Sequence, residues 1–416
     1  MKLKPIALAV MLTGMSAQPV MADDMSDLKA QLKAMQQQMQ MMQNKLDAQE
    51  AALKKQQQVA TEIKHQQASG HTGDTTTKRV AHEVADSISM GGVIEVVTSK
   101  TNSDGWGGDT ASDIVLDTFE LGIEASASEW VSGSVLFLYE DADDDNLNVD
   151  EAFITIANSE VTPFYGSFGR LYVPFGNFES HMISDPATLT LGETREDVVQ
   201  FGFESEDGLY GSAYVFNGDA DELNDDDTID NYGLNLGYAM GNDDFDLDVG
   251  VGYINNIATS DSLQDIVDGN GLCGSGGCIK DYVGGMSFHA ITNIGQFNLI
   301  GEYVTAMDEF EMNELGVGEE LKPRAWNIEG AYNFELAGKD ATVALGYQKT
   351  KDMYLDNSST DFFEKAWLAS ISVGIYENTT LAAEWRHADG YSETEAAVGN
   401  DYDDEDLLKL KLSYDF

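Results

Sequence analysis

The sequence predicts an all-β transmembrane barrel of about sixteen antiparallel strands, preceded by an N-terminal α-helical coiled coil. Three observations carry this prediction. The last strand alternates apolar and polar side chains up to its final residue. A secretory leader is followed by no apolar run long enough for a spanning helix. The connections between candidate strands alternate between short and long.

The first 22 residues have the features of a secretory signal peptide, with a mature start expected at Asp23. Lys2 and Lys4 precede an apolar core at 6–15, and 20–22 (VMA) resembles a small-residue cleavage site. No later apolar run approaches the ~18 residues that a spanning helix needs. Because lipid satisfies no backbone polar groups, such a chain is expected to enter a bilayer only as a closed barrel.

Residues 23–65 are predicted to form a periplasmic coiled coil. The stretch 25–63 contains no Gly or Pro and follows heptads in which Gln enters the seam in the C-terminal half. A solitary polar helix or a disordered Gln-rich tail is the alternative. Residues 66–87 have the composition of a flexible linker. Heptad position a holds Met25, Leu32, Met39, Leu46, Leu53 and Ala60. Position d holds Leu28, Met35, Met42, Gln49, Gln56 and Ile63.

The barrel is predicted to span 88–416. Side chains that alternate with a period of two indicate strands with one apolar and one polar face, as in Trp326 and Ile328 against Asn327 and Glu329. The candidate strands are 88–99, 113–126, 130–140, 147–157, 162–172, 196–205, 209–217, 229–240, 244–256, 281–292, 295–306, 322–335, 340–351, 362–374, 377–388 and 404–416.

The closing strand gives the clearest alternation. One face holds Leu408, Leu410, Leu412, Tyr414 and Phe416, and the other face holds Lys409 and Lys411 among polar neighbours. An alternating strand that ends in Phe is typical of the assembly signal of outer-membrane barrels, and Tyr414 and Phe416 are the expected signal residues.

The connections favour the same topology. Short connections such as 127–129 and 375–376 alternate with long ones such as 173–195 and 257–280. Short periplasmic turns and long outer loops are the pattern of outer-membrane barrels. An even number of strands places both barrel ends in the periplasm, on the same side as the coil. Only Pro163, Pro174, Pro186 and Pro323 follow the signal peptide, as expected where strands pair along their whole length.

The barrel region is strongly acidic. Residues 91–416 hold 13 Lys+Arg against 64 Asp+Glu, a net charge of −51. This balance excludes nucleic acid as a partner. It favours cations, divalent bridging to lipopolysaccharide, or simple solvation in a saline habitat. Several acid runs, such as 143–145 and 225–227, fall in the predicted outer loops.

The loop 173–195 is the most apolar of the predicted outer loops, with Phe175, Phe178 and Met182 among its side chains. Such a loop is expected to fold into the lumen and narrow the pore. The alternatives are a loop that packs over the mouth or at a subunit contact. Inside the lumen it would supply Glu179, His181, Asp185, Glu193 and Arg195 to the constriction.

Basic side chains are expected on the wall facing that loop. The parity of the last two strands points Arg386, Lys409 and Lys411 inward, and a transverse field across the pore would orient a dipolar or anionic solute. Alternatively these side chains partner inward acids such as Glu384 and Asp415. Arg170 precedes the loop, and it joins the candidates although the parity of its strand is ambiguous.

The remaining reactive residues point away from catalysis. Cys273 and Cys278 are separated by a Gly-rich spacer in a secreted chain and are predicted to form an intraloop disulfide. Without an adjacent His they make a weak metal site, and no cofactor is expected. The six histidines fall in no metal-binding or nucleophile pattern, so no enzymatic activity is expected. A lipase with a Ser–His pair outside any motif is the alternative.

The segments 169–179 (GRLYVPFGNFE) and 183–194 (ISDPATLTLGET) resemble the LbtU-like siderophore porin family of Gram-negative bacteria. The resemblance covers essentially the whole mature chain. It implies passage of an iron–siderophore complex through an outer-membrane barrel without an energy-coupled plug. The residues before the barrel are accordingly too few and too polar for a plug domain. Many siderophores carry carboxylates, and an acidic barrel repels them unless the constriction is basic.

A general or dicarboxylate-type diffusion porin shares this layout and is the first alternative function. An envelope tether whose coil reaches toward the cell wall is the second. The expected partners are outer-membrane lipid and lipopolysaccharide, a second and third copy of the chain in a homotrimer, and ferric siderophore as cargo.

Overall fold

The computed structural model describes residues 82–85, 88–104, 110–141, 146–223, 228–242, 245–269, 279–316, 318–353, 363–391 and 404–416. All of them lie in the compact unit His65–Phe416. The predicted signal peptide, the coiled coil, the disulfide between Cys273 and Cys278 and the acid runs 143–145 and 225–227 lie outside the described residues.

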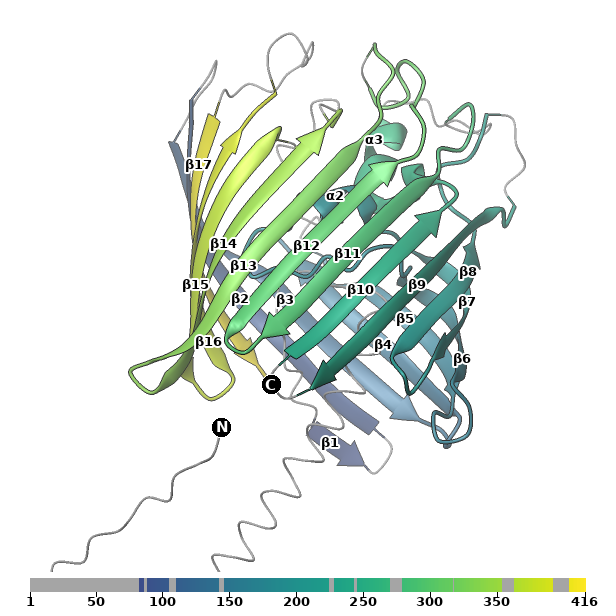
Figure 1. Ribbon diagram of the computed structural model, residues 1–416, viewed down its shortest axis with the longest axis horizontal. Coiled ribbons are helices and arrows are strands. Elements are labelled where there is room, and N and C mark those ends of the chain that lie inside the picture. Colours follow the sequence, from purple (N-terminus) through teal and green to yellow (C-terminus); the bar gives the residue numbers. More distant parts are fainter. Residues whose placement is uncertain are drawn as a thin grey trace, which may run out of the picture. The chain divides into compact units, whose positions relative to one another are not determined.

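Within this part of the chain, sixteen strands form a closed antiparallel barrel (Figure 1). Each strand pairs with its neighbour in sequence, and the last pairs with the first, with Leu410 opposite Thr98. The strands are β2 (Ile88–Asp104), β3 (Thr110–Ser126), β4 (Val131–Glu140), β5 (Asn148–Ala157), β6 (Phe164–Tyr172), β7 (Arg195–Glu204), β8 (Leu209–Phe216), β9 (Asn231–Asn242), β10 (Phe245–Ile254), β11 (Gly285–Ile294), β12 (Phe297–Ala306), β13 (Arg324–Leu336), β14 (Lys339–Lys351), β15 (Lys365–Tyr376), β16 (Thr379–Asp389) and β17 (Asp404–Asp415).

The prediction of a sixteen-strand barrel is confirmed, with differences at a few strand ends. β2 continues to Asp104 rather than ending at 99, because its polar end still pairs with β17 after the apolar alternation has stopped. A seventeenth strand, β1 (His82–Ala85), pairs with the start of β2. Four residues are too few to produce a recognisable period, so the sequence does not predict it.

Side chains alternate between the two faces of the wall as the closing strand predicts. In β17, the side chains from Leu408 to Tyr414 on the outer face are 45–54% exposed, whereas Lys411 on the inner face is 4% exposed. Phe416 continues the pairing, since its backbone N–H and C=O exchange hydrogen bonds with Gly92 at 3.0 Å each. A Cβ at Gly92 would lie 2.2 Å from the Glu120 carbonyl oxygen and 2.8 Å from the Phe416 ring. Only glycine therefore fits where β2 receives the last residue.

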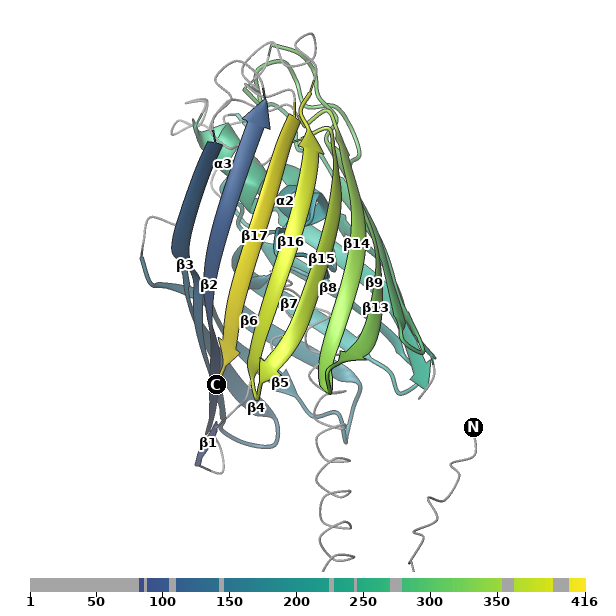
Figure 2. The same ribbon diagram turned by 90° about the vertical axis from the view of Figure 1, so that its left-hand side faces the viewer.

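The two rims of the barrel differ. The short turns gather at the end where the C-terminus lies, and the long loops gather at the other end (Figures 1 and 2). No helix among the described residues has the length and the apolar character needed to cross a membrane.

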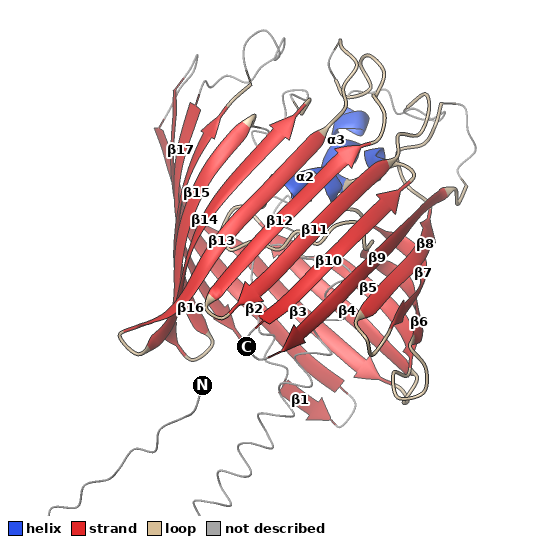
Figure 3. Cartoon of the chain, viewed as in Figure 1, coloured by secondary structure: helices blue, strands red, loops and turns tan. Residues whose placement is uncertain are grey.

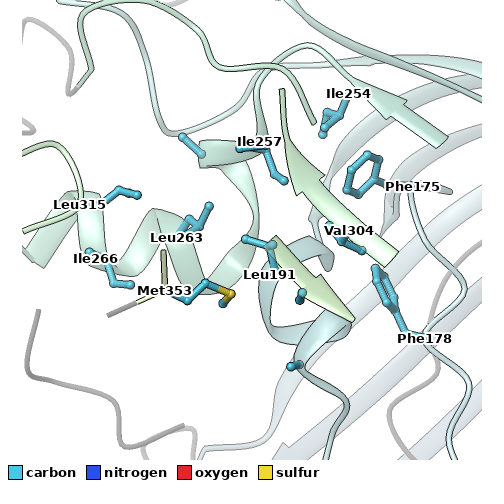
Figure 4. Packing of buried hydrophobic residues seen from close by; sticks show 14 of the residues in the cluster. Phe175, Phe178, Leu191, Ile254, Ile257, Leu263, Ile266, Val304, Leu315 and Met353 are labelled. Carbon is cyan, nitrogen blue, oxygen red and sulfur yellow. The ribbon is translucent and has the colours of Figure 1, made fainter. Parts of the chain in front are cut away.

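Two helices lie inside the barrel near the long-loop end (Figure 3): α2 (Ala187–Gly192) in the third long loop and α3 (Asp261–Gly269) in the fifth, just after the 3₁₀ turn η1 (Ile257–Thr259). Their apolar side chains, including Leu191, Ile257 and Leu263, pack against Val304 of the wall and Met353 (Figure 4). The main apolar cluster of the described residues therefore lies within the barrel and holds the loops in place.

Candidate functional site: the constriction loop

The residues 173–194, which connect β6 to β7 and are called the constriction loop here, run along the inside of the wall (Figure 3). Phe175, Met182 and Leu191 are fully buried. Near its tip, Ile183 packs on Val97 of β2 and Ala382 of β16. This is the placement that the apolar composition of the loop predicts.

Three buried carboxylates of the wall, called the wall carboxylates, accept hydrogen bonds from the constriction loop. The first is Glu302 of β12. Its oxygens accept from the backbone N–H of Asn177 at 2.7 Å, the N–H of Phe178 at 3.1 Å and the hydroxyl of Thr188 at 2.8 Å. The beginning of the loop and its helix α2 are thus joined through one side chain.

The other two wall carboxylates hold the middle and the tip. Glu329 of β13 accepts from the Ser180 hydroxyl and the His181 N–H, both at 2.7 Å. Glu384 of β16 accepts from the N–H of Ile183, and from the N–H and the hydroxyl of Ser184 at 3.0 and 2.7 Å. A buried carboxylate is costly unless it is hydrogen-bonded, and here the amide and hydroxyl donors of the loop supply those bonds.

Glu179 and Asp185 are the exposed residues of the constriction loop. Because the opposite side of the loop is pressed against the wall, these two carboxylates face the lumen. His181 is half-buried, with its Nε2 2.7 Å from the Asn298 side-chain oxygen and its carbonyl accepting from the Ser370 hydroxyl at 2.8 Å. The structure therefore leaves two of the predicted constriction residues exposed and places His181 against the wall.

Glu193 and Arg195 lie at the base of the loop rather than at its tip. The Arg195 guanidinium pairs with the fully buried Asp150 at 2.5 Å, and the Tyr172 hydroxyl donates to the same carboxylate at 3.1 Å. The Arg195 N–H donates to Asp261, the first residue of α3, at 3.1 Å. Burial, reinforced by the nearby Glu193, raises the pKa of Asp261 to about 7.

The predicted basic wall residues are inward, and two of them pair with carboxylates. Arg386 contacts Glu405 at 2.7 Å, and Lys411 contacts Glu95 at 3.2 Å with both side chains buried. Lys409 lies opposite Glu384 in the ladder. These side chains belong to the wall region that the loop tip touches. They surround the tip instead of facing it across the lumen, which matches the alternative of partners for inward acids.

Arg170 is placed elsewhere. It lies opposite Ala152 and Asp197, on the face of β6 that carries the outward-facing Phe168, and it pairs with Asp197 at 3.2 Å while both side chains are exposed. The expectation that Arg170 lines the lumen is therefore corrected. Gly169 adopts a φ of 136°, and this departure from ordinary strand geometry explains why the parity could not be followed through the sequence.

No family model matches the chain. It is 26% identical over 303 residues to a UPF0422 protein of Coxiella burnetii (strain RSA 493), covering 71% of this chain and 63% of that one. It is 27% identical over 321 residues to a UPF0422 protein of Legionella pneumophila (strain Philadelphia 1), covering 72% and 57%. The chain spans about three fifths of the length of these relatives.

Solved structures with a similar fold are outer-membrane channels. The DcaP channel of Acinetobacter baumannii aligns with a TM-score of 0.52 at 14% identity, over 79% of this chain and 97% of DcaP. An anion-selective porin from Comamonas acidovorans aligns at 0.54 and 10%, over 79% and 99%. OprB of Pseudomonas putida aligns at 0.54 and 8%, over 83% and 100%. The fold is that of an outer-membrane porin.

The charged side chains of the constriction loop and of the wall around it are what a solute would meet inside the barrel. Arg195, Arg386 and Lys411 are paired with acids, and Lys409 lies opposite Glu384 in the ladder. Glu179 and Asp185 are exposed on the constriction loop. Charged side chains at a narrow point of a pore set which ions pass. Within the described residues, no group of three or more His, Cys, Asp or Glu side chains is arranged to hold a metal ion.

The sequence points the wall carboxylates inward by strand parity, but it does not show what they bind. Their partners lie 114–201 residues earlier in the chain. The sequence signal that could have indicated these contacts is a combination of two features. Acids lie on the inner face of several strands, and the apolar loop needs polar partners for its backbone.

Proposed function

We propose that this protein is a porin of the outer membrane, through which small solutes pass by passive, selective diffusion without any catalytic step. The observation that carries the proposal is the constriction loop held on the inner wall by the wall carboxylates. A loop fixed at eight backbone and side-chain donors gives a pore of defined width, which selective diffusion requires.

For the cargo we propose iron–siderophore complexes. The support is the resemblance of 169–179 and 183–194 to the LbtU-like siderophore porins. These segments include Asn177, Ser184 and Thr188, which bind the wall carboxylates. The resemblance is thus concentrated in the residues that shape the narrow part of the pore. The porin fold also supports a location in the outer membrane of a Gram-negative cell.

A general or dicarboxylate-type diffusion porin is the second candidate. The lumen-facing Glu179 and Asp185 favour a general, cation-preferring channel over one for dicarboxylates, because carboxylates at the constriction repel an anionic solute.

Planar-bilayer recording of the purified full chain distinguishes these candidates. We expect stepwise conductance that a ferric siderophore blocks in a concentration-dependent way, whereas the iron-free chelator does not. A ferric hydroxamate and a ferric catecholate should be compared, since they differ in charge. Strong cation preference in the reversal potential with no block by either complex would refute the siderophore cargo. An absence of conductance from correctly folded protein would refute the porin itself.

We further propose that the protein self-associates as a homotrimer through the coil predicted at 25–63. Crosslinking should trap an oligomer that disappears when 25–63 is deleted, while the conductance of each barrel persists. A monomer in both cases would exclude this role of the coil. Loss of envelope integrity on deletion, without a change in transport, would instead support the envelope tether.

A further inference from the structure

The outward face of β13–β15 carries a group of cationic side chains at the long-loop end. Residues 91–416 contain only 13 Lys+Arg, and a third of them gather on these three neighbouring strands. All share the strand parity of exposed, outward residues such as Trp367 and Leu345. We call this group the rim cluster; it consists of Arg324, Lys349, Lys351 and Lys365.

The strand register brings the rim cluster together. Arg324 lies directly opposite Lys351, and Lys349 lies directly opposite Lys365. Side chains opposite each other across a ladder are about 4.5–5.5 Å apart at Cβ, and like charges there are destabilising. This arrangement lowers the stability of the isolated barrel, and a bound anion between the strands would reverse the effect.

The described contacts satisfy the charges of the rim cluster only in part. Lys365 pairs with Asp389 at 3.3 Å, with both side chains partly exposed. The Nε of Arg324 is buried and has no hydrogen-bond partner among the described residues.

An aromatic band gives the depth of the rim cluster in the membrane. Trp326, Tyr347 and Trp367 each lie two residues nearer the barrel middle than a member of the cluster. The ring centroids of Tyr347 and Trp367 are 4.7 Å apart, and those of Tyr303 and Trp326 are 4.9 Å apart. Aromatic girdles of this kind mark the membrane–water interface of barrels. Two residues of strand add about 7 Å, so the cluster stands at the level of the lipid headgroups.

The surface below the band suits acyl chains. Leu345 is 67% exposed and Ile328 58%, and both face outward on the strands of the rim cluster. A soluble anion makes no apolar contact with such a surface. A phosphorylated lipid contacts it with its acyl chains while its phosphates reach the cations of the rim cluster. These strand ends lie at the top of Figure 2, on the long-loop side.

We propose that the rim cluster binds the phosphate groups of lipopolysaccharide in the outer leaflet, with the acyl chains lying along β13–β15. The inference rests on the proposed function, because it takes the long loops as the outer side. Arg and Lys form charge-assisted hydrogen bonds with phosphate, and Arg324 supplies a guanidinium for bidentate contact. The rim cluster then orders a lipid on a barrel whose overall charge is strongly negative.

Binding of bisphosphorylated lipid A to the purified full chain in detergent tests the proposal. The variant R324Q/K349Q/K351Q/K365Q should bind about 600-fold more weakly, because each of the four basic side chains near an anionic membrane surface contributes a factor of about five to the affinity. K339Q is the matched control, because Lys339 begins the same strand β14 at the opposite rim. It should bind as the wild type does.

Two further ligands separate the sources of the interaction. Lipid A without phosphates should bind the wild type and the quadruple variant equally weakly. Inorganic phosphate, at the concentration used for lipid A, should show no binding to the wild type. Equal affinity of wild type and quadruple variant for bisphosphorylated lipid A would overturn the proposal. Tight binding of inorganic phosphate alone would overturn the lipid as the ligand.

A second variant and a second measurement keep the test decisive. K351Q alone changes an exposed side chain and should fold; we expect about a fivefold loss of lipid A affinity. Conductance in bilayers should be unchanged in both variants, because the rim cluster lies outside the lumen. Loss of lipid binding with normal conductance supports the rim cluster, whereas an absence of conductance in every chain, including the wild type, would count against the proposed function instead.

Discussion

Replacing Glu302 by alanine should detach the first part of the constriction loop from the wall. The side chain is buried and accepts hydrogen bonds from Asn177, Phe178 and Thr188 at 2.7, 3.1 and 2.8 Å. Hydrogen bonds to a charged group contribute about 1.5–3 kcal/mol each, or roughly 5–9 kcal/mol for three. Removing a buried carboxylate also removes its desolvation cost of several kcal/mol. The docked state of the loop should therefore lose about 2–4 kcal/mol.

Amide hydrogen exchange measures this loss directly. Protection of the Asn177 and Phe178 amides should fall by about 30- to 1,000-fold, since each 1.4 kcal/mol corresponds to a factor of about ten. Single-channel conductance should rise at the same time, because the released loop no longer narrows the lumen. E302Q keeps one acceptor oxygen in place and should give a smaller effect on both quantities.

A matched control uses another carboxylate of the inner wall. Asp248 of β10 accepts from the Tyr210 hydroxyl at 2.7 Å and lies 3.6 Å from His289. D248N should leave the exchange of Asn177 and Phe178 unchanged. If folded E302A protein keeps wild-type protection at these two amides, the wall carboxylates do not hold the loop, and its buried apolar side chains do so alone.

Three other perturbations test separate parts of the structure. E179Q/D185N should lower the cation-to-anion permeability ratio by about fivefold, as expected from ~1 kcal/mol between charges in water, and an unchanged reversal potential would place these carboxylates away from the ion path. G92A should destabilise the barrel by about 1–3 kcal/mol in urea unfolding, because the added Cβ overlaps the Glu120 carbonyl and the Phe416 ring. Deletion of Phe416 should likewise reduce insertion into the membrane. Normal surface levels of both variants would contradict the role of Gly92 and Phe416 in closing the barrel. Burial raises the pKa of Asp261 to about 7, above the ~3.9 of an unfolded Asp, so its stabilising contribution is complete below about pH 4 and is lost as the pH rises through 7. Between about pH 4 and pH 7, the difference in unfolding free energy between wild type and D261N should change by up to about 1.4 kcal/mol per pH unit. A difference that does not depend on pH would refute the raised pKa of Asp261.

The wall of the barrel was predictable from the sequence because its signal is local. Leu408, Leu410 and Leu412 must face lipid, and that requirement alone sets the direction of Lys409 and Lys411. The same reasoning sets the direction of Arg386. It gave no direction for Arg170, whose strand parity is ambiguous in the sequence and which follows Gly169 with its positive φ.

The interior was less predictable because its contacts join distant parts of the chain. The apolar loop 173–195 indicates burial, but nothing local shows that Glu384 meets Ser184, 200 residues earlier. Helix α3 does have a local signal: Leu263, Ile266 and Val267 follow helical spacing within the fifth long loop, and all three are buried. The pairing of Arg195 with Asp150 depends on three-dimensional proximity alone.

The long separation between the constriction loop and the wall carboxylates also orders the events of assembly. The donors lie at 177–188, whereas the acceptors lie on β12, β13 and β16, late in the chain. Contacts at such sequence separation form only after the intervening chain has been brought into place. The loop can therefore dock only when the C-terminal strands stand beside it. Until β12, β13 and β16 are in place, the constriction loop therefore lacks all three carboxylates that hold it on the inner wall.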